Sequence, residues 1–334
     1  MGCMKPLSRN LFKLFSYLLI IVCLQSCSTE VGIWRNEQIS QSKLDDLHQL
    51  NRQVFECLKS NNTKKLESYL SKELLDDHYT LQAVGTLSNA LQRDSFMRLD
   101  EYYVQNKYIL ADTITVKNKG INNYSLIYPG TAQEMYINLL VPKTNTPNRS
   151  MITIIYAHYD YGWKVSTLDI NPYLLNGKTA PELFQLAKKE YDSGYLLSAA
   201  NTITQATTCT RPNSIWKYAI EDGLYTFFDK ATGEANNKFH YPIILNEVST
   251  RPRIIRIYNK TTNEGTYPII CYLTKINLKD VAAIERENNE IKKKIGLVMP
   301  GIDKNKTLLH YAAYNEMMSS KASVPHYDIT DRLQ

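Results

Sequence analysis

One short segment, residues 156–161, holds the side chains of this chain that are best suited to acid–base chemistry. In an alternating strand, Tyr156 and His158 project from the same face. Histidine titrates near neutral pH, and a carboxylate that orients its ring prepares it to act as a general base. Asp160 is the nearest carboxylate, but an aspartate beside a turn such as the one before Gly162 commonly serves local hydrogen bonding and faces solvent. The sequence therefore offers His158 as a candidate catalytic base, with Tyr156 and Asp160 beside it and no second inward-facing acid.

Other reactive residue types form no recognisable motif. The sequence contains no nucleophile elbow and no Gly-rich phosphate loop. We predict no cofactor and no metal site. Three cysteines lie beyond the first 27 residues, far apart and without a CxxC pair, and we interpret them as buried apolar side chains. One disulfide with one free thiol is the alternative in an oxidising compartment. These cysteines are Cys57, Cys209 and Cys271.

The N-terminus has the three-part pattern of an export signal. It is basic, with Lys5, Arg9 and Lys13 and no acidic residue among them, and an apolar run of 11 residues follows at 14–24. A helix needs about 20 apolar residues to cross a bilayer, so this run is too short to span one. We therefore predict a signal peptide over residues 1–26. An ordinary secretory signal beside a chance cysteine and an uncleaved membrane anchor are the alternatives.

The residues directly after the apolar run, Leu24-Gln-Ser-Cys27, resemble the lipobox of bacterial lipoproteins. The resemblance implies that Cys27 is lipidated and becomes the mature N-terminus. Two or more acyl chains hold a protein stably on a membrane, so this cysteine would anchor the whole chain. Ser28, rather than Asp, follows the cysteine, which by the sorting rule of enteric bacteria implies the outer membrane. The periplasmic and the surface-exposed side both stay open.

Composition limits the partners of the mature chain. The whole chain carries a formal net charge of +6, and loss of the three basic residues of the signal lowers this to +3. The only basic run is Lys292-Lys-Lys294, which suits the C-terminal end of a helix, so we expect no nucleic-acid partner. The remaining length is enough for about two domains of ordinary size.

Hydrophobic periodicity predicts an α+β fold for the first half of the chain. Residues 27–41 are polar and unpatterned and suggest a tether. Apolar residues at three- and four-residue steps from Leu44 to Leu58 predict an amphipathic helix, followed by a short helix around residues 66–74 and a third over 81–98. Alternating patterns bounded by turn residues then predict an antiparallel sheet. Its expected strands lie near 102–117, 121–128, 132–141, 150–159 and 163–170.

This region resembles the NTF2-like fold in its SnoaL-like variants. The resemblance spans residues 42–171, including the first two helices and the closing hairpin with Gly162-Trp-Lys-Val165. It implies a curved antiparallel sheet, covered by helices, that can enclose a ligand cavity at its open end. In enzymatic members His, Asp and Tyr in that cavity transfer protons, which would give His158, Asp160 and Tyr156 their role.

The second half of the chain is predicted to contain a helical connector and a second α+β unit. Two helices joined at Gly194 and closed by Pro212 resemble a single tetratricopeptide repeat; a plain connector and a peptide-binding groove are its two interpretations. A third helix is expected over 213–230, making a unit at 180–232, and the polar stretch 232–237 is taken as a boundary. The C-terminal unit is expected at 240–320. Its predicted elements are strands at 253–258 and 267–275, a helix at 278–295, strands at 295–299 and 308–314, and a loose end.

These features favour a membrane-anchored envelope lipoprotein with a non-catalytic role, binding a partner protein or a small ligand. The alternative is a small-molecule enzyme that uses the pocket of the first domain, with His158 as base. A position of His158 on the outer face of the sheet would argue against the second hypothesis.

Overall fold

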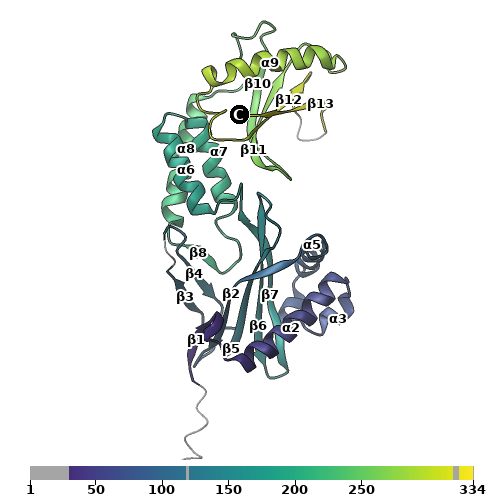
Figure 1. Cartoon of the computed structure of the whole chain (residues 1–334), viewed down its shortest axis with the longest axis vertical. Coiled ribbons are helices and arrows are strands. Elements are labelled where there is room, and N and C mark those ends of the chain that lie inside the picture. The colour runs from purple at the N-terminus through teal and green to yellow at the C-terminus, as the bar shows by residue number, and fades with distance from the viewer. Residues whose placement is uncertain (1–29, 118–119, 319–322, 334) are drawn as a thin grey trace, which may run out of the picture.

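The computed structural model describes residues 30–117, 120–318 and 323–333, and its fold is α+β as predicted. The signal peptide, Cys27 and the first part of the expected tether lie outside these residues. Figure 1 shows two units at opposite ends of the molecule with a group of helices between them. Among the described residues, no helix is both long and apolar enough to span a membrane.

The first unit is built on a five-stranded antiparallel sheet. Successive side chains of each strand point to opposite faces of this sheet. One face packs under the helices of the same unit and the other packs against segments that follow in the chain, so both faces are buried. The register sets Tyr136 opposite Tyr156 and Met135 opposite Ala157. The strand order is β1 (Gly32–Arg35), β2 (Phe96–Gln105), β5 (Glu134–Pro142), β6 (Arg149–Tyr159) and β7 (Gly162–Leu174).

Helices cover one face of this sheet. The apolar stripe of the longest helix supplies Val54 and Leu58, which are fully buried together with Leu87 from the last helix and Tyr136 and Tyr156 from the sheet. These helices are α2 (Gln41–Lys59), α3 (Thr63–Glu67), α4 (Lys72–Asp76) and α5 (Thr80–Arg93).

Two predictions for this unit are wrong at their edges. Residues 32–38 of the expected tether form β1 and a 3-10 turn, η1 (Asn36–Gln38), because Gly32 to Arg35 pair with the end of β2. The third helix ends at Arg93, and residues 96–98 begin β2 instead of continuing the helix. In both places cross-strand pairing outweighs weak local periodicity.

The opposite face of the sheet packs against a small second sheet and the connector. The predicted strand at 102–117 is split between β2 and β3 (Asp112–Val116), which pairs with β4 (Tyr124–Tyr128). The helix predicted from residue 213 is wrong at its start, because β8 (Trp216–Tyr218) adds to β4 there. Trp216 stacks on Tyr124 with ring centroids 3.6 Å apart, so burial of the two rings fixes the strand.

The connector comprises α6 (Ala180–Asp192), α7 (Leu196–Thr208) and α8 (Glu221–Lys238). The two helices predicted around Gly194 are confirmed, and this glycine has a φ of 78° in the turn between them. The boundary predicted at 232–237 is wrong, because those residues continue α8. Helix α7 belongs to both units: Ile203 packs in the core of the first, and Leu197 in the core of the C-terminal unit.

The C-terminal unit is a five-stranded sheet with one helix across it. Residues 295–299, predicted as a strand, mostly belong to the helix α9 (Val281–Val298), which makes the crossover that the parallel pair β11–β12 requires. The expected loose end instead forms an antiparallel edge strand. The strands, in sheet order, are β13 (His326–Arg332), β12 (Leu308–Tyr314), β11 (Gly265–Leu273), β10 (Arg253–Thr262) and β9 (Ile243–Ile244).

The three described cysteines are buried free thiols, so the disulfide alternative is wrong for this structure. Burial raises the pKa of Cys209 to about 12 and that of Cys271 to about 11. A thiol with such a pKa is protonated and unreactive at neutral pH.

Candidate functional site

The predicted base, His158, lies near the end of β6 on the face of the sheet that α2 covers. Tyr156 projects from the same face, but the two side chains have different surroundings. His158 is 44% exposed at the rim of the unit, and its ring stacks on Trp163 with centroids 5.0 Å apart. The histidine is therefore accessible at the mouth of the predicted cone.

Tyr156 and Asp160 do not join His158 in a site. Tyr156 is completely buried beneath α2, its hydroxyl donates to Asn51 Oδ1 at 2.8 Å, and burial raises its pKa well above the ordinary value. Asp160 is exposed in the turn between β6 and β7. Tyr156 thus supports the helix–sheet interface, and Asp160 faces solvent.

The carboxylate that orients His158 is Glu134, which the sequence did not indicate. His158 Nδ1 lies 3.0 Å from Glu134 Oε2. Glu134 begins β5, and the pairing of Met135 with Ala157 sets it beside His158 across the sheet. The residues are far apart in the sequence, so only the register of β5 against β6 brings them together.

Two further side chains hold Glu134 in place. The Tyr103 hydroxyl donates to Glu134 Oε1, and Lys43 Nζ lies 3.4 Å from the same oxygen. The ammonium of Lys43 also lies 3.8 Å from the centre of the Tyr103 ring. Burial and the neighbouring carboxylate raise the pKa of Tyr103, so its hydroxyl stays protonated. Lys43, Tyr103, Glu134 and His158 are called the rim cluster below.

The space beneath the rim cluster is filled by the protein itself. Glu101 is buried there and accepts hydrogen bonds from Tyr136 Oη at 2.5 Å and from His48 Nε2 at 2.8 Å. Arg98 Nε lies 3.2 Å from Glu101 Oε2 and places a positive charge beside this carboxylate. A hollow of about 240 Å³ remains at the rim, lined in part by Lys43, Glu134 and Trp163. Any ligand of this unit would therefore meet the rim and not the interior.

A larger hollow lies between the two units. It has a volume of about 560 Å³, within the range of ligand sites, and its walls come from β7, α7 and β10. Figure 1 shows the β10–β11 hairpin pointing toward the ends of β6 and β7, with α7 alongside. Most of the lining residues carry an amide or a hydroxyl group, but apolar atoms, including those of Leu174 and Ile257, form much of the lining surface, and Arg149 is the charged residue among them. We call this hollow the interdomain cleft.

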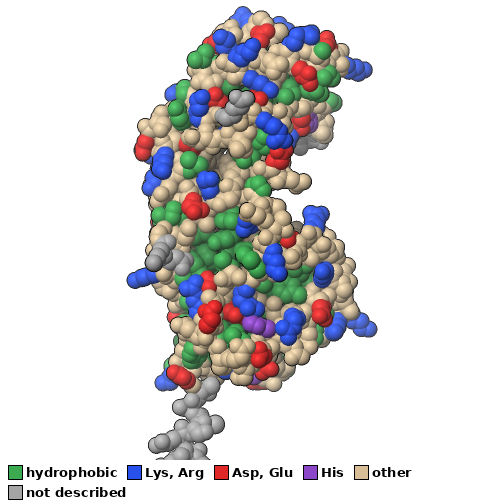
Figure 2. All heavy atoms as spheres, viewed as in Figure 1, with side chains coloured by type: hydrophobic (Ala, Val, Ile, Leu, Met, Phe, Trp, Pro, Cys, Tyr) green, Lys and Arg blue, Asp and Glu red, His purple; other side chains and the backbone are tan. Residues whose placement is uncertain are grey.

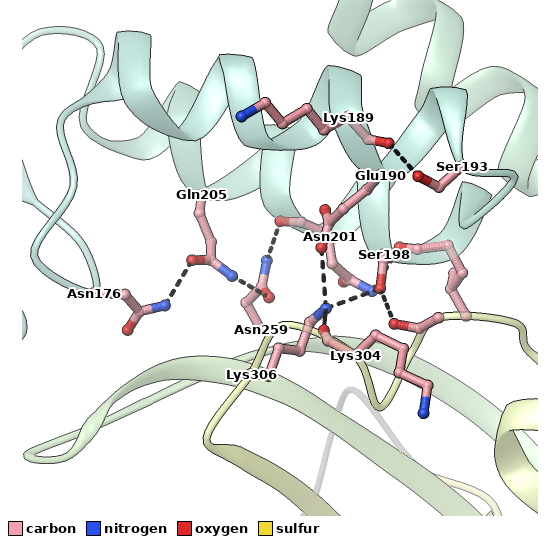
Figure 3. Close-up of polar contacts among 12 residues, drawn as sticks. Asn176, Lys189, Glu190, Ser193, Ser198, Asn201, Gln205, Asn259, Lys304 and Lys306 are labelled. Carbon is pink, nitrogen blue, oxygen red and sulfur yellow. Dashed lines mark hydrogen bonds and ion pairs between the residues drawn. The ribbon is translucent and has the colours of Figure 1, made fainter. Parts of the chain in front are cut away.

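Polar contacts fix the walls of this cleft relative to one another (Figure 3). Asn176 Nδ2 donates to Gln205 Oε1 at 3.0 Å, and Gln205 Nε2 donates to Asn259 Oδ1 at 3.1 Å. Asn259 Nδ2 in turn donates to the carbonyl of Asn201 at 2.9 Å. These amides join the first unit, α7 and β10 in one chain of hydrogen bonds.

A buried ion pair strengthens the same junction. Lys306 Nζ lies 3.2 Å from Glu190 Oε1 and 2.8 Å from Ser198 Oγ (Figure 3). The side chain of Lys306 is only 7% exposed and that of Glu190 only 2%. At the same junction Gly301, with a φ of 82°, packs against Tyr195. A Cβ atom on residue 301 would fall 2.1 Å from the tyrosine ring, so this close approach requires glycine. The amide chain and this ion pair are called the interdomain network.

One wall of the cleft is an open strand edge. Strand β10 pairs with β11 along its length, but β9 covers only Arg253 and Ile254 on the other side. In a hairpin with a two-residue loop, the two residues that flank the loop exchange main-chain hydrogen bonds with each other. Along the strands, the following residue pairs are alternately without and with such bonds. Thr262 and Gly265 form that pair, so the main-chain groups of Ile257, Asn259 and Thr261 point away from β11. All three residues line the cleft.

Other kinds of site find no support within the described residues. They contain no group of three or more His, Cys, Asp or Glu side chains placed to hold a metal ion. Basic and acidic side chains are interspersed over the visible face, without a basic stripe among the described residues there (Figure 2). In comparisons with known proteins, no family model, no curated protein and no solved structure matches this chain.

Proposed function

We propose that this chain is a bacterial envelope lipoprotein, anchored in the outer membrane through Cys27, whose interdomain cleft holds an extended segment of a partner protein. The anchor is supported by the short apolar run and the lipobox-like residues at 24–27. We also propose that residues 42–171 are related to the NTF2-like fold, supported by α2–α5 covering one face of an antiparallel sheet.

The observation that carries the proposed function is the open edge of β10 inside the cleft. An extended peptide can add to such an edge as a further strand, with main-chain hydrogen bonds giving the affinity. Ile257, Asn259 and Thr261 present the required main-chain groups, and residues 255–262 make no main-chain hydrogen bond in the described chain except those to β11.

The lining of the cleft fits the same ligand. A peptide main chain is neutral and needs hydrogen-bonding partners, and the hydroxyl oxygens of Ser150, Thr204 and Thr208, which line the cleft, can accept from it. No carboxylate, histidine or lysine lines the cleft, so the described residues favour binding over acid–base chemistry there. The interdomain network holds the walls in place, which reduces the entropy lost when a ligand binds.

The test is to select short peptides from a displayed library on the mature protein and to measure their affinity by calorimetry. Thr204→Trp fills the cleft and should weaken binding by at least roughly tenfold, or about 1.4 kcal/mol. Thr207→Trp is the matched control, because Thr207 lies on the same helix outside the lining and its hydroxyl likewise bonds a helix carbonyl.

Methylation of alternate peptide nitrogens provides the decisive comparison. If the peptide adds to β10, methylation on the side that faces the strand removes binding, and methylation on the other side does not. Equal binding of both methylated peptides, or selection of saccharides and no peptide from a parallel glycan panel, would contradict the proposed function.

A second candidate function, proton transfer at the rim cluster, is favoured by the 3.0 Å pair of His158 and Glu134. With Nδ1 directed at a carboxylate, the other ring nitrogen is the one that accepts a proton from a substrate. The exposure of His158 leaves that nitrogen accessible at the mouth of the unit.

This candidate is tested with 5-nitrobenzisoxazole, a general probe for a positioned base. The base removes the carbon-bound proton, and the N–O bond of the ring breaks to give a phenolate nitrile. His158→Gln should lower the rate by at least roughly tenfold if His158 acts as a general base. His78→Gln, which changes an exposed histidine away from the rim cluster, is the control. Equal rates for both variants would exclude this role of His158.

A further inference from the structure

An exposed apolar loop follows β2 at the end of the molecule where the described chain begins. Tyr108, Ile109 and Leu110 are consecutive, and their side chains are 62%, 58% and 67% exposed. Val31, directly before β1, is 57% exposed. Contiguous apolar residues at a surface mark an interaction site more often than single ones do. We call Tyr108, Ile109 and Leu110 the apolar loop.

The backbone of the apolar loop is held so that its side chains project outward. Gln133 Nε2 donates to the carbonyl of Lys107 at 3.1 Å, and Leu110 N donates to the carbonyl of Tyr108 at 3.1 Å. Gly130 lies directly beneath, where an added Cβ atom would fall 2.0 Å from Leu110 O. The protein therefore packs the main chain of this segment and leaves its apolar side chains uncovered.

The strand register places this loop close to the site of lipidation. Gly32 pairs with Gln105, so the chain segment from Cys27 enters beside the start of the loop. Five residue steps separate Cys27 from Gly32, and an extended chain spans at most about 18 Å over that distance. Tyr108 follows Gln105 by three residues, so it lies within about 11 Å of the same point. A lipid on Cys27 would therefore attach at the same end of the molecule as the loop.

We propose that Tyr108, Ile109 and Leu110 insert into the membrane interface as a second contact beside the lipid on Cys27, an inference that rests on the proposed lipid anchor. Tyrosine suits the boundary between headgroups and acyl chains, while isoleucine and leucine gain free energy by leaving water. Lys107, whose ammonium lies 5.3 Å from the Tyr108 ring centre, adds attraction to anionic lipid.

The inference has a structural consequence for the whole molecule. Helix α9 lies at the opposite end from β1 (Figure 1). A lipid alone leaves the protein free to tilt, whereas a second contact at the same end holds the C-terminal unit and the interdomain cleft away from the membrane. The apolar loop thus orients the cleft toward partners beyond the membrane surface.

The test places an environment-sensitive dye on Ile109→Cys, with Leu297→Cys as the matched control. Leu297 is 72% exposed on α9, so it is an equally accessible apolar position at the far end. The native thiols do not compete, because Cys57, Cys209 and Cys271 are buried. The mature protein is reconstituted in vesicles of phosphatidylethanolamine and phosphatidylglycerol that contain a nitroxide-labelled lipid. The dye at 109 should shift to the blue and lose most of its emission, and the dye at 297 should do neither.

Mass spectrometry of the N-terminal peptide separates the two proposals. An unquenched dye at 109 on a chain with an acylated Cys27 would overturn the insertion and leave the anchor intact. If no acyl group is found, the same dyes are tested on residues 28–334 held to nickel-chelating vesicles by a histidine tag, and quenching at 109 then supports the loop alone. A blue shift that grows with protein concentration without vesicles would show that a second copy covers the loop, and would overturn the inference.

Discussion

The rim cluster and the interdomain network each contain a lysine close to a glutamate, but the side chains of the two clusters differ in burial. In the interdomain network, Lys306 and Glu190 are almost fully buried, whereas in the rim cluster His158 is 44% and Lys43 is 43% exposed. A buried ion pair contributes to the architecture, because losing one partner leaves an unpaired charge away from water. An exposed pair contributes little stability and remains accessible to ligands. Burial therefore separates the polar groups that hold this molecule together from those that are free to do chemistry.

The largest effect is expected from Lys306→Met, which leaves the buried carboxylate of Glu190 without its cation. The free energy of unfolding should fall by about 3–5 kcal/mol, measured by denaturant titration. Lys304→Met is the control, because the Lys304 side chain is 60% exposed and its ion pair with Asp303 is long, at 3.7 Å. Equal stabilities of the two variants would show that the interdomain network is not a structural support.

A smaller loss is expected from Tyr156→Phe in the interior of the first unit. The change removes the donor to Asn51 Oδ1 and leaves a buried acceptor unpaired, which costs about 1–3 kcal/mol. The phenyl ring keeps the packing, so a circular dichroism spectrum should not change. A stability equal to that of the unchanged protein would mean that water replaces the tyrosine hydroxyl.

The pH dependence of stability should report on a buried histidine of the C-terminal unit, His310. Burial, and then the nearby Lys260, lowers the pKa of His310 below its ordinary value of 6.5. The unfolded chain therefore takes up a proton at a higher pH than the folded chain, so the free energy of unfolding falls as pH drops below about 6.5. His310→Gln should flatten this part of the stability profile. An unchanged slope in that variant would assign the pH dependence to other groups.

The smallest effect is expected from Glu134→Gln in the rim cluster. An exposed or half-exposed ion pair contributes about 0–1 kcal/mol, so the midpoint of unfolding should hardly move. The variant should nevertheless change the reactivity of His158 toward diethyl pyrocarbonate, because the ring loses the carboxylate that orients it. A loss of stability as large as that of Lys306→Met would remove the distinction between the two clusters.

Part of the candidate site could be predicted from the sequence. Alternation in the strand was enough to place Tyr156 and His158 on one face and His158 near its end. Glu134 could not be found in this way, because it belongs to another strand and approaches His158 through the pairing of β5 with β6. Asp160 was the nearest acid in the sequence, and it faces solvent because a turn directs it outward.

The fold likewise contains elements that the sequence predicts and elements that arise only from strand pairing. The helices around residues 44–58 and 180–208 were predictable, because each carries an apolar stripe that fixes its face. The strand β8 was not, because three residues gain their structure from pairing with β4 and from the contact between Trp216 and Tyr124. The C-terminal strand β13 was missed for a similar reason, since its alternating polar residues pair along β12.

By itself, the sequence determined the α+β class and the amphipathic faces of the main helices, and it supplies the basis for the proposed lipid anchor at Cys27. These properties depend on the pattern of apolar residues within short segments of the chain. The tertiary structure decided the rim cluster, the interdomain cleft, the open edge of β10 and the position of the apolar loop beside β1. Each of these joins residues that are distant in the chain, and such contacts arise from strand register and packing, which no local pattern specifies.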